Sequence, residues 1–367
     1  MKLFLCSIVA AILWQVGQWK GIAALADLSF PTSTHSSFGK PHYIGEYFDE
    51  IGYYQALRVA DTRPLVRKQS AFQLIEVFEN DHYGKILVLD GVLQLTERDA
   101  DAYNEMMAHV PMFQNREPKR VLVIGGGDGY VVSEVLKHES VVLVDHVDLD
   151  GEVIETCRQH FSWGKQVWED NADRVQLHLL DGALFVEQAK DGFYDVIIQD
   201  SSDPWAWNEE GEKYALPSSV LYSKRHLMNL HRILAPGGVL SFQAESLQIP
   251  SDLQDIARWR QDALQVGFRE ARYGSITISS YPTGQIGFLL CEKSLPAPGL
   301  YQQVKERYEK MIDQEGGATT YYHPRLQSSA FDIPLWAEQA IYGPNGISNH
   351  VCLQNDWNNE SSPSIEG

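Results

Sequence analysis

Two aspartates follow a short apolar run in the segment Val196 to Pro204, VIIQDSSDP. The run is typical of a buried strand in a parallel sheet, and open α/β sheets bind ligands at the carboxyl ends of such strands. Asp200 and Asp203 would then stand at a ligand-binding edge, where two carboxylates can hold a cationic amine and remove a proton from it. The alternative is an Asx turn that Pro204 closes, and this segment alone favours neither.

A glycine-rich turn lies upstream, in the stretch Val121 to Gly129, VLVIGGGDG. Glycines such as Gly125 and Gly127 let the backbone turn sharply and approach a ligand closely. About twenty residues on, the next apolar run ends at Asp148 and Asp150, where a carboxylate can accept from ribose hydroxyls. The turn lacks both the GxGxxG spacing and the lysine of phosphate-binding loops. It therefore predicts a nucleoside without a pyrophosphate, such as an adenosylmethionine-type ligand.

Two further aspartates each fit two roles. Asp128, within the glycine turn, can pair with a ligand cation or cap the next helix. Asp181 follows another apolar run and can accept from an adenine amino group or cap a helix. With Asp148, Asp200 and Asp203, they place acids after successive strands, where the carboxylates would repel one another unless a cation is bound. This crowding favours a binding site over a structural role.

The elements that would position these residues alternate between strands and helices from Lys119 onward. This order predicts a parallel, doubly wound α/β sheet. Pro236-Gly237-Gly238 is expected to end the last of the helices named below. We expect strands at Val121 to Ile124, Val141 to Val147, Val175 to Leu180, Val196 to Gln199, Val239 to Gln243 and Ile286 to Cys291, and helices at Val131 to Lys137, Glu152 to Phe161 and Tyr222 to Leu234.

The remaining segments differ in character. Residues 42–117 carry short β-patterned runs, hairpin turns and one helix at 99–113, which predict a small β-rich N-terminal domain. Residues 118–342 would form the catalytic domain with its C-terminal helices, and residues 343–367 a disordered tail.

The composition limits the choice of ligands. The formal charge of −19 argues against nucleic acid and suits a cationic small molecule. The four cysteines lack zinc-binding or disulfide-framework spacing, and the twelve histidines form no metal-binding motif. We therefore expect no metal site.

The N-terminus predicts targeting. Lys2 precedes an apolar run from Leu3 to Trp14, and Ala24-Leu25-Ala26 resembles a cleavage site. Residues 1–26 would be a signal or targeting peptide for the secretory route or an organelle, and residues 27–41 a linker. The mature protein would be soluble without a stable membrane span, and the whole chain cytoplasmic if the leader does not function.

Five motifs in this order resemble the spermidine synthases, a family of polyamine aminopropyltransferases: YGKILVLDGVLQLTERD (83–99), IGGGDGY (124–130), DSSDP (200–204), SYPTGQIGFLLCEK (280–293) and YYHPRLQSSAFDIP (321–334). The resemblance runs from about Tyr43 to Tyr342. It implies a Rossmann-like, methyltransferase-type fold and a homodimer. It also implies transfer of an aminopropyl group from decarboxylated S-adenosylmethionine, as co-substrate, to putrescine, giving spermidine and methylthioadenosine with no bound cofactor.

The resemblance assigns a role to each site residue. Asp200 would accept the proton with the help of Tyr103, and Asp203 with Asp128 would hold the donor's amine or the near end of the acceptor. Donor binding would involve Gln73, Asp128, Asp148, Asp181, Gly125 and Gly127, and acceptor binding Asp203, Tyr281 and Gln243. The structural alternatives are core aromatics for the tyrosines and an ordinary strand residue for Gln73.

Departures from the family pattern concern ligand contacts more than the reaction. Asp148 replaces a usual Glu, and Asn104 a usual Gln. Gly52-Tyr53-Tyr54 replaces a Trp-containing stretch, and the loop at 205–220 is longer and carries two extra tryptophans. The alternatives are therefore a spermine or thermospermine synthase, a putrescine N-methyltransferase that uses ordinary S-adenosylmethionine, or a non-catalytic polyamine- or nucleoside-binding protein.

Overall fold

The computed structural model describes residues 42–343, except 60, 62, 166, 208–212, 296 and 297. The expected targeting peptide, the linker and the tail from residue 344 onward lie outside the described residues. All described residues belong to one compact unit, Ser37–Gly367.

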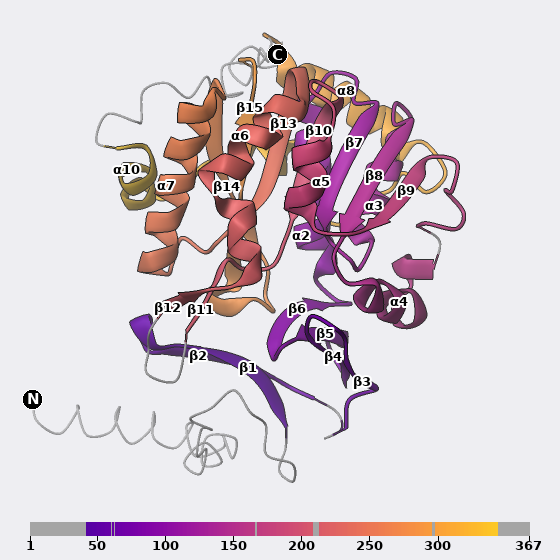
Figure 1. Ribbon diagram of the computed structural model, residues 1–367, viewed down its shortest axis with the longest axis vertical. Coiled ribbons are helices and arrows are strands. Elements are labelled where there is room, and N and C mark those ends of the chain that lie inside the picture. Colours follow the sequence, from indigo (N-terminus) through magenta and orange to yellow (C-terminus); the bar gives the residue numbers. More distant parts are fainter. Residues whose placement is uncertain are drawn as a thin grey trace, which may run out of the picture. The chain divides into compact units, whose positions relative to one another are not determined.

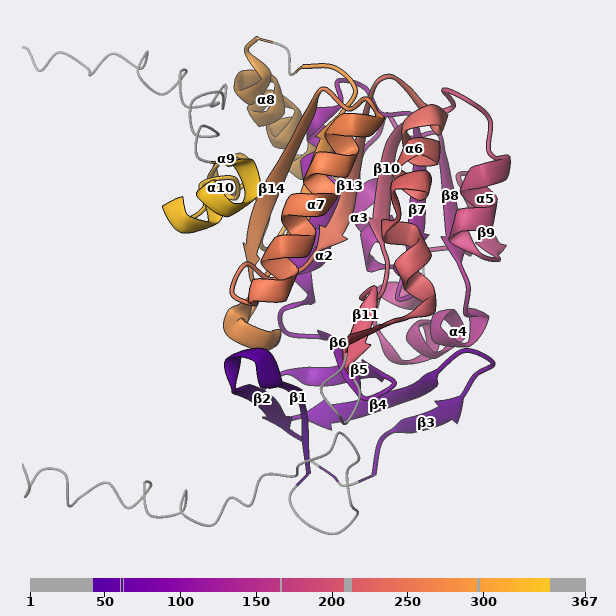
Figure 2. The same ribbon diagram turned by 60° about the vertical axis from the view of Figure 1, so that its left-hand side comes forward.

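The N-terminal part is built from antiparallel strands. A hairpin of β1 (Tyr43–Phe48) and β2 (Tyr53–Arg58) is followed by a four-stranded sheet of β3 (Val66–Gln69), β4 (Leu74–Asn80), β5 (Gly84–Leu89) and β6 (Val92–Thr96). The β5–β6 turn has positive φ at Asp90 and Gly91, as its Asp-Gly sequence predicts. Figures 1 and 2 show these strands together below the larger sheet.

A buried helix leads from this part into the larger sheet. In α2 (Ala100–Gln114), every residue except Asp101 is buried. A helix that is covered on all sides lies inside the protein rather than on its surface. Tyr103 is therefore held rigidly from the first turn of a packed helix.

A seven-stranded sheet forms the centre of the molecule, in the order β14-β15-β13-β10-β7-β8-β9. The strands are β7 (Arg120–Gly125), β8 (Leu143–Asp148), β9 (Val175–Leu179), β10 (Tyr194–Asp200), β13 (Leu234–Ala244), β14 (Glu270–Thr277) and β15 (Gln285–Glu292). The first five are parallel, as predicted, but β15 runs antiparallel to both β13 and β14. The all-parallel prediction was wrong at this edge because only residues 278–284 join β14 to β15. So short a connection permits only an antiparallel pair.

Helices cover both faces of this sheet, as doubly winding requires. Alternate residues of β7 face opposite ways: Leu122 and Ile124 join the core under α5 (Gly182–Gln188), α6 (Lys224–Ile233) and α7 (Pro250–Val266). Val121 and Val123 join the core under α2, α3 (Tyr130–Leu136) and α8 (Leu300–Ile312). Figure 1 shows α5, α6 and α7 in front of the sheet. The remaining helices are α4 (Gly151–His160), α9 (Pro324–Ser329) and α10 (Leu335–Tyr342).

The predicted elements match these to within a few residues. The helix expected from Tyr222 to Leu234 is α6, which Ser223 caps and which a 3-10 turn, Pro217–Tyr222, precedes. Pro236-Gly237-Gly238 does not end that helix but lies inside β13, where the pairing with β10 shifts register. The long loop at 205–220 contains a small hairpin of β11 (Trp205–Trp207) and β12 (Lys213–Ala215). None of the helices described between residues 42 and 343 has the length and apolar character to cross a membrane.

Candidate active site

A cavity of about 440 Å³ lies at the carboxyl edge of the parallel strands, between the large sheet and the N-terminal part. Every site residue predicted from the sequence lines it: Gln73, Tyr103, Gly125, Gly127, Asp128, Asp148, Asp181, Asp200, Asp203, Gln243 and Tyr281. Tyr103 and Tyr281 are therefore not only core aromatics, because both also line the cavity.

These residues follow the spatial order of the strands. Asp181 follows β9, Asp148 ends β8 and Asp128 follows β7, whereas Asp200 ends β10 and Gln243 lies at the end of β13. The glycine turn thus occupies the middle of the edge. A ligand that spans the cavity would run across the strand ends, with Asp148 and Asp181 at its β8–β9 side.

Asp200 is held by one side-chain bond and by its own backbone. The Tyr103 hydroxyl donates to Asp200 Oδ1 at 2.7 Å, and the Gly126 N–H donates to the Asp200 carbonyl at 2.8 Å. Burial raises the pKa of Asp200 to about 6, although the Tyr103 bond counteracts this by favouring the carboxylate. A carboxylate with this pKa is ionised at neutral pH and is a stronger base than an ordinary aspartate. This suits a proton acceptor.

Asp128 lies within the glycine turn, and Asp148 lies beside it. Burial, reinforced by the charge of Asp200, raises the pKa of Asp128 to about 7. Burial likewise raises the pKa of Asp148 to about 7. Asp128 Oδ1 also accepts from the Tyr130 N–H at 2.8 Å, so the helix-start role and the site role coexist. Such carboxyls are poised to ionise fully when a cation enters.

Asp150 and Gln73 connect the N-terminal sheet to the start of α4. Asp150 accepts from the Glu152 N–H as the N-cap of α4, from Gln73 Nε2 at 3.0 Å and from Ser70 Oγ at 2.6 Å. Of the two acids predicted for ribose, Asp150 therefore ties the N-terminal sheet to α4. Asp148 packs against the turn, where a Cβ on Gly127 would lie 2.8 Å from Asp148 Oδ2.

Asp181 also caps a helix. Its Oδ1 accepts from the N–H groups of Ala183 and Leu184 at 2.7 and 3.1 Å, which fixes the carboxylate at the start of α5. The residue still lines the cavity, so both roles considered for it are compatible.

The far end of the cavity is more acidic than the sequence predicted. Gln243 Nε2 donates to Asp203 Oδ1 at 3.3 Å, and Glu245 hydrogen-bonds to Asp203. Burial and the charge of Asp203 raise the pKa of Glu245 well above its ordinary value. Burial and the same charge raise the pKa of Glu46 to about 8. Glu46, from β1, and Glu245, directly after β13, are site residues that sequence reasoning missed.

The N-terminal hairpin reaches the cavity through different residues from those expected. Glu46 and Phe48 line it, whereas Tyr53 and Gln55 hold the adjoining loop: Gln55 Nε2 donates to the Ser280 carbonyl at 3.0 Å. The Tyr281 hydroxyl donates to the Gln94 carbonyl at 2.5 Å. This end of the cavity is therefore lined by residues of the N-terminal hairpin and by the loop that carries Tyr281.

Asp99 joins these parts at one point. Its carboxylate accepts from Thr96 Oγ1 at 2.6 Å, from Ser280 N and Oγ at 2.9 Å, and from Ser279 Oγ at 2.8 Å. These bonds join the segment that ends in Asp99 to the segment that starts at Ser279. They set the loop that presents Tyr281.

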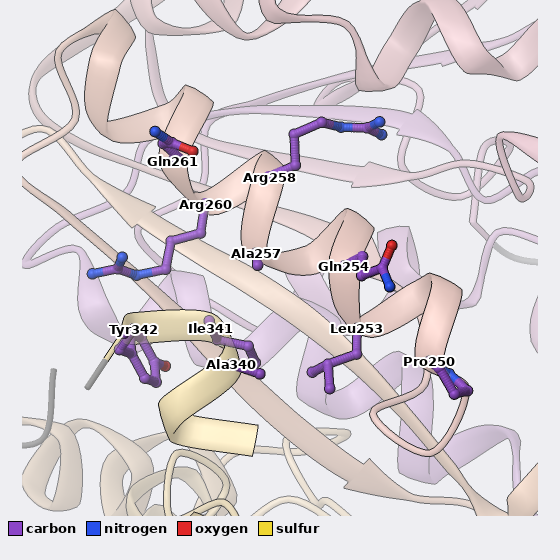
Figure 3. Close-up of a pocket in the computed structure, with 11 residues that line it drawn as sticks. Pro250, Leu253, Gln254, Ala257, Arg258, Arg260, Gln261, Ala340, Ile341 and Tyr342 are labelled. Atoms are coloured by element: carbon purple, nitrogen blue, oxygen red, sulfur yellow. The ribbon is translucent and has the colours of Figure 1, made fainter. Parts of the chain in front are cut away.

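A second cavity, of about 680 Å³, lies between α7 and α10 (Figure 3). Its two arginines point away from each other: Arg260 lies 4.6 Å over the Tyr342 ring, and Arg258 pairs with Asp255 at 2.8 Å. No carboxylate lines it. The chemistry predicted from the sequence therefore belongs to the cavity at the strand ends.

Across residues 42–343, the described His, Cys, Asp and Glu side chains form no group of three or more that could hold a metal ion.

The fold and the site together define a class. A glycine turn flanked by acids suits a nucleoside, a base of raised pKa suits an amine, and a third group of acids suits the amine's far end. This is the arrangement of a nucleoside-dependent transferase that acts on amines.

Comparisons with known proteins agree. Residues 100–300 match the spermine/spermidine synthase domain, and residues 47–97 match the spermidine synthase tetramerisation domain. Spermidine synthase 1 of Hyoscyamus niger is 37% identical over 282 residues, covering 76% of this chain and 84% of the relative. Spermidine synthase 2 of Arabidopsis thaliana is 37% identical over 284 residues, covering 76% and 78%.

Solved structures show the same fold. A spermidine synthase in complex with the transition-state analogue AdoDATO has a TM-score of 0.70 at 27% identity, covering 86% of this chain and 98% of that one. The spermidine synthase of Thermotoga maritima has a TM-score of 0.68 at 27% identity. The chain belongs to the spermidine synthase family and is an aminopropyltransferase, as its motifs predicted.

Proposed function

We propose that the chain transfers the aminopropyl group of decarboxylated S-adenosylmethionine to putrescine, giving spermidine and methylthioadenosine. The observation that carries this is the sequence of acids along one cavity, from Asp148 to Asp200 to Asp203 and Glu245. A solved relative binds a transition-state analogue, AdoDATO, and the curated relatives are spermidine synthases, which supports the same pair of substrates.

The donor would occupy the half of the cavity beside β7, β8 and β9. Asp148 would accept from the ribose hydroxyls and Asp181 from the adenine amino group. Asp128 would face the positive sulfonium and amine, whose charge would lower its raised pKa and keep it ionised. No phosphate needs to be bound, which fits a glycine turn without a lysine.

The chemical step would be an in-line displacement beside sulfur. The acceptor's ammonium group gives one proton to Asp200 and becomes a free amine. Its nitrogen lone pair then forms a bond to the carbon beside sulfur, while the carbon–sulfur bond electrons return to sulfur. The products are a secondary ammonium and an uncharged thioether, with the released proton on Asp200. The protein contributes alignment and proton removal.

The acceptor's far ammonium group would lie among Asp203, Glu245 and Glu46. Burial raises the pKa of all three carboxyls, and the charge of a bound ammonium group would favour their ionised forms. A diamine presents one such cation beyond the reacting nitrogen, so putrescine satisfies this cluster with a single charge. A longer triamine is the second candidate, because three acids can hold more than one positive charge.

Products identified by mass spectrometry would decide between these activities. The full chain is incubated with decarboxylated or intact S-adenosylmethionine and with putrescine, cadaverine or spermidine, one acceptor at a time. Spermidine from putrescine and the decarboxylated donor is expected. If only the intact donor gives product, the proposal is rejected in favour of N-methylation. If spermidine is the only acceptor that gives product, putrescine is rejected as the acceptor.

The proposed base has its own test. Asp200→Asn keeps the shape of the side chain but cannot take the proton, so turnover should be lost while methylthioadenosine still binds. A fully active variant would contradict the mechanism. Nucleoside binding without turnover in the wild-type chain, over the whole panel, would indicate a binding protein instead.

Assembly and targeting remain separate proposals. We propose a homodimer, and the tetramerisation domain matched by residues 47–97 makes a tetramer the alternative; light scattering after gel filtration separates them by mass. We also propose that residues 1–26 direct the chain to the secretory route or an organelle. A reporter fused to residues 1–45 that stays cytosolic would refute targeting.

A further inference from the structure

A buried histidine supports the glycine turn from within the sheet. His146 lies in the middle of β8, two residues before Asp148, and no part of it is exposed. Since side chains alternate along a strand, His146 and Asp148 lie on the same face of the sheet. Nothing in the proposed reaction uses His146 directly.

Its two ring nitrogens have unambiguous roles. The Trp168 indole N–H donates to His146 Nδ1 at 3.0 Å, and an indole nitrogen can only donate. Nδ1 therefore carries no proton, so the proton is on Nε2. Nε2–H then donates to the Gly125 carbonyl at 2.8 Å. Burial lowers the pKa of His146 to about 4, so the ring stays neutral in this tautomer at physiological pH.

The carbonyl that His146 holds belongs to a peptide that is fixed at both ends. The Gly125 C=O and the Gly126 N–H are parts of one peptide group. The C=O accepts from His146 on β8, and the N–H donates to the Asp200 carbonyl on β10 at 2.8 Å. Both glycines have positive φ, +77° and +63°. A peptide between two glycines turns over at little steric cost, so these two hydrogen bonds select its orientation.

Trp168 steadies the other end of the turn. Its ring lies nearly parallel to that of His146, with an interplanar angle of 8° and centroids 5.7 Å apart, and a Cβ on Gly129 would lie only 2.7 Å from its Cη2 atom. The same side chain thus sets the histidine tautomer and packs under the last glycine of the turn.

We propose that His146, oriented by Trp168, is a positioning residue that fixes the nucleoside-binding form of the Gly125–Gly126 peptide and couples it to the backbone of Asp200. This inference rests on the proposed function, in which the turn binds the donor nucleoside. The effect should appear in donor binding, since the acceptor end is formed by β13 and β1.

The test measures methylthioadenosine affinity by calorimetry for the full-length wild type and three variants. His146→Phe keeps an aromatic ring but removes both the acceptor for Trp168 and the donor to Gly125, and it should weaken binding about tenfold or more. His146→Gln can both accept from Trp168 and donate to Gly125, and it should recover affinity to within about threefold. His178→Phe removes another histidine bond from the same half of the sheet, to Asp145, and should change little.

Two further readouts separate positioning from simple loss of packing. In steady-state kinetics, His146→Phe should raise KM for the donor and leave KM for the acceptor unchanged. Without ligand, the Gly126 amide should exchange hydrogen faster in this variant than in wild type. Unchanged affinity in a folded His146→Phe chain, or a loss that Gln does not repair, would overturn the inference. A wild-type chain that binds no methylthioadenosine would overturn the proposed function, and this inference with it.

Discussion

Replacing Tyr103 with Phe removes a single hydroxyl that stabilises the ionised form of the proposed base. The ring remains, and with it the packing against Tyr281, whose centroid is 6.1 Å away. The lost bond is short, 2.7 Å, and ends on a carboxylate. Hydrogen bonds to charged groups contribute about 1.5–3 kcal/mol, and 1.36 kcal/mol is about one pKa unit. The pKa of Asp200 should therefore rise from about 6 by about 1.5 units.

The sign of the pH dependence follows. A base is inactive when protonated, so raising its pKa reduces activity on the acid side and leaves the alkaline side nearly unaffected. At pH about 6.5, the ionised fraction of Asp200 should fall about eightfold, whereas at pH about 9 it should be almost complete in both proteins. The ratio of kcat/KM between wild type and Tyr103→Phe should therefore decrease as the pH rises.

The assay is initial-rate formation of methylthioadenosine by liquid chromatography between pH 6 and 9, and the ratio is the quantity of interest. Ionisations that both proteins share, such as those of Asp128 and Asp148, cancel in it. Tyr194→Phe is the matched control, because its hydroxyl donates to Asp145 at 2.8 Å, buried and outside the cavity. The ratio of kcat/KM between wild type and Tyr194→Phe should not change with pH. A flat ratio for Tyr103→Phe would show that this bond does not set the pKa of the base.

Three other outcomes are expected. Gly125→Ala should abolish nucleoside binding measured by calorimetry, because its Cβ would lie 2.0 Å from a backbone oxygen of β10. Gly192→Ala, at φ +61° in open space, should keep nucleoside binding and cost only about 1 kcal/mol of unfolding free energy in denaturant. Equal nucleoside affinity in the two variants would refute the steric argument. Glu245→Gln should raise KM for the acceptor about tenfold with KM for the donor unchanged, since a charged partner of the far ammonium is lost; a change in the donor KM would contradict this assignment. Burial lowers the pKa of His109 to about 3, so the unfolded chain takes up a proton at this residue below pH about 6.5 that the folded chain does not; from this residue alone, acidification from pH 7 to 4 should cost about 3 kcal/mol of unfolding free energy, and His109→Phe should lose less than wild type by that amount.

Much of the site could be predicted because it depends on a local rule. Acids that directly follow parallel strands meet at one edge whatever the strand order, so Asp128, Asp148, Asp181 and Asp200 could be grouped without knowing the topology. The same rule applies to Glu245, which follows β13, but the strand was expected to end at Gln243. Glu245 lies two residues beyond that expected end, within the reach of the rule, and was overlooked.

Other features depend on contacts between distant segments. Glu46 reaches the cavity only because the β1–β2 hairpin packs over the strand ends, which no local pattern indicates. Strand β14 was missed because Gly274 interrupts its apolar pattern. In the structure that glycine lies opposite Phe288, and a Cβ there would be 2.3 Å from the ring. The glycine is thus a requirement of cross-strand packing that its own segment does not reveal.

The order of the strands gives the cavity a property of evolutionary interest. From β9 to β13 the edge crosses five adjacent strands, a width of about 19 Å at about 4.8 Å per strand. Under the proposed function, nucleoside recognition falls at the ends of β7, β8 and β9, and recognition of the amine's far end falls after β10 and β13 and on β1. We therefore expect substitutions after β13 or on β1 to alter the preferred amine while nucleoside binding is kept. The two ends of the edge could then evolve independently, so that new amine acceptors are acquired without rebuilding the transfer chemistry.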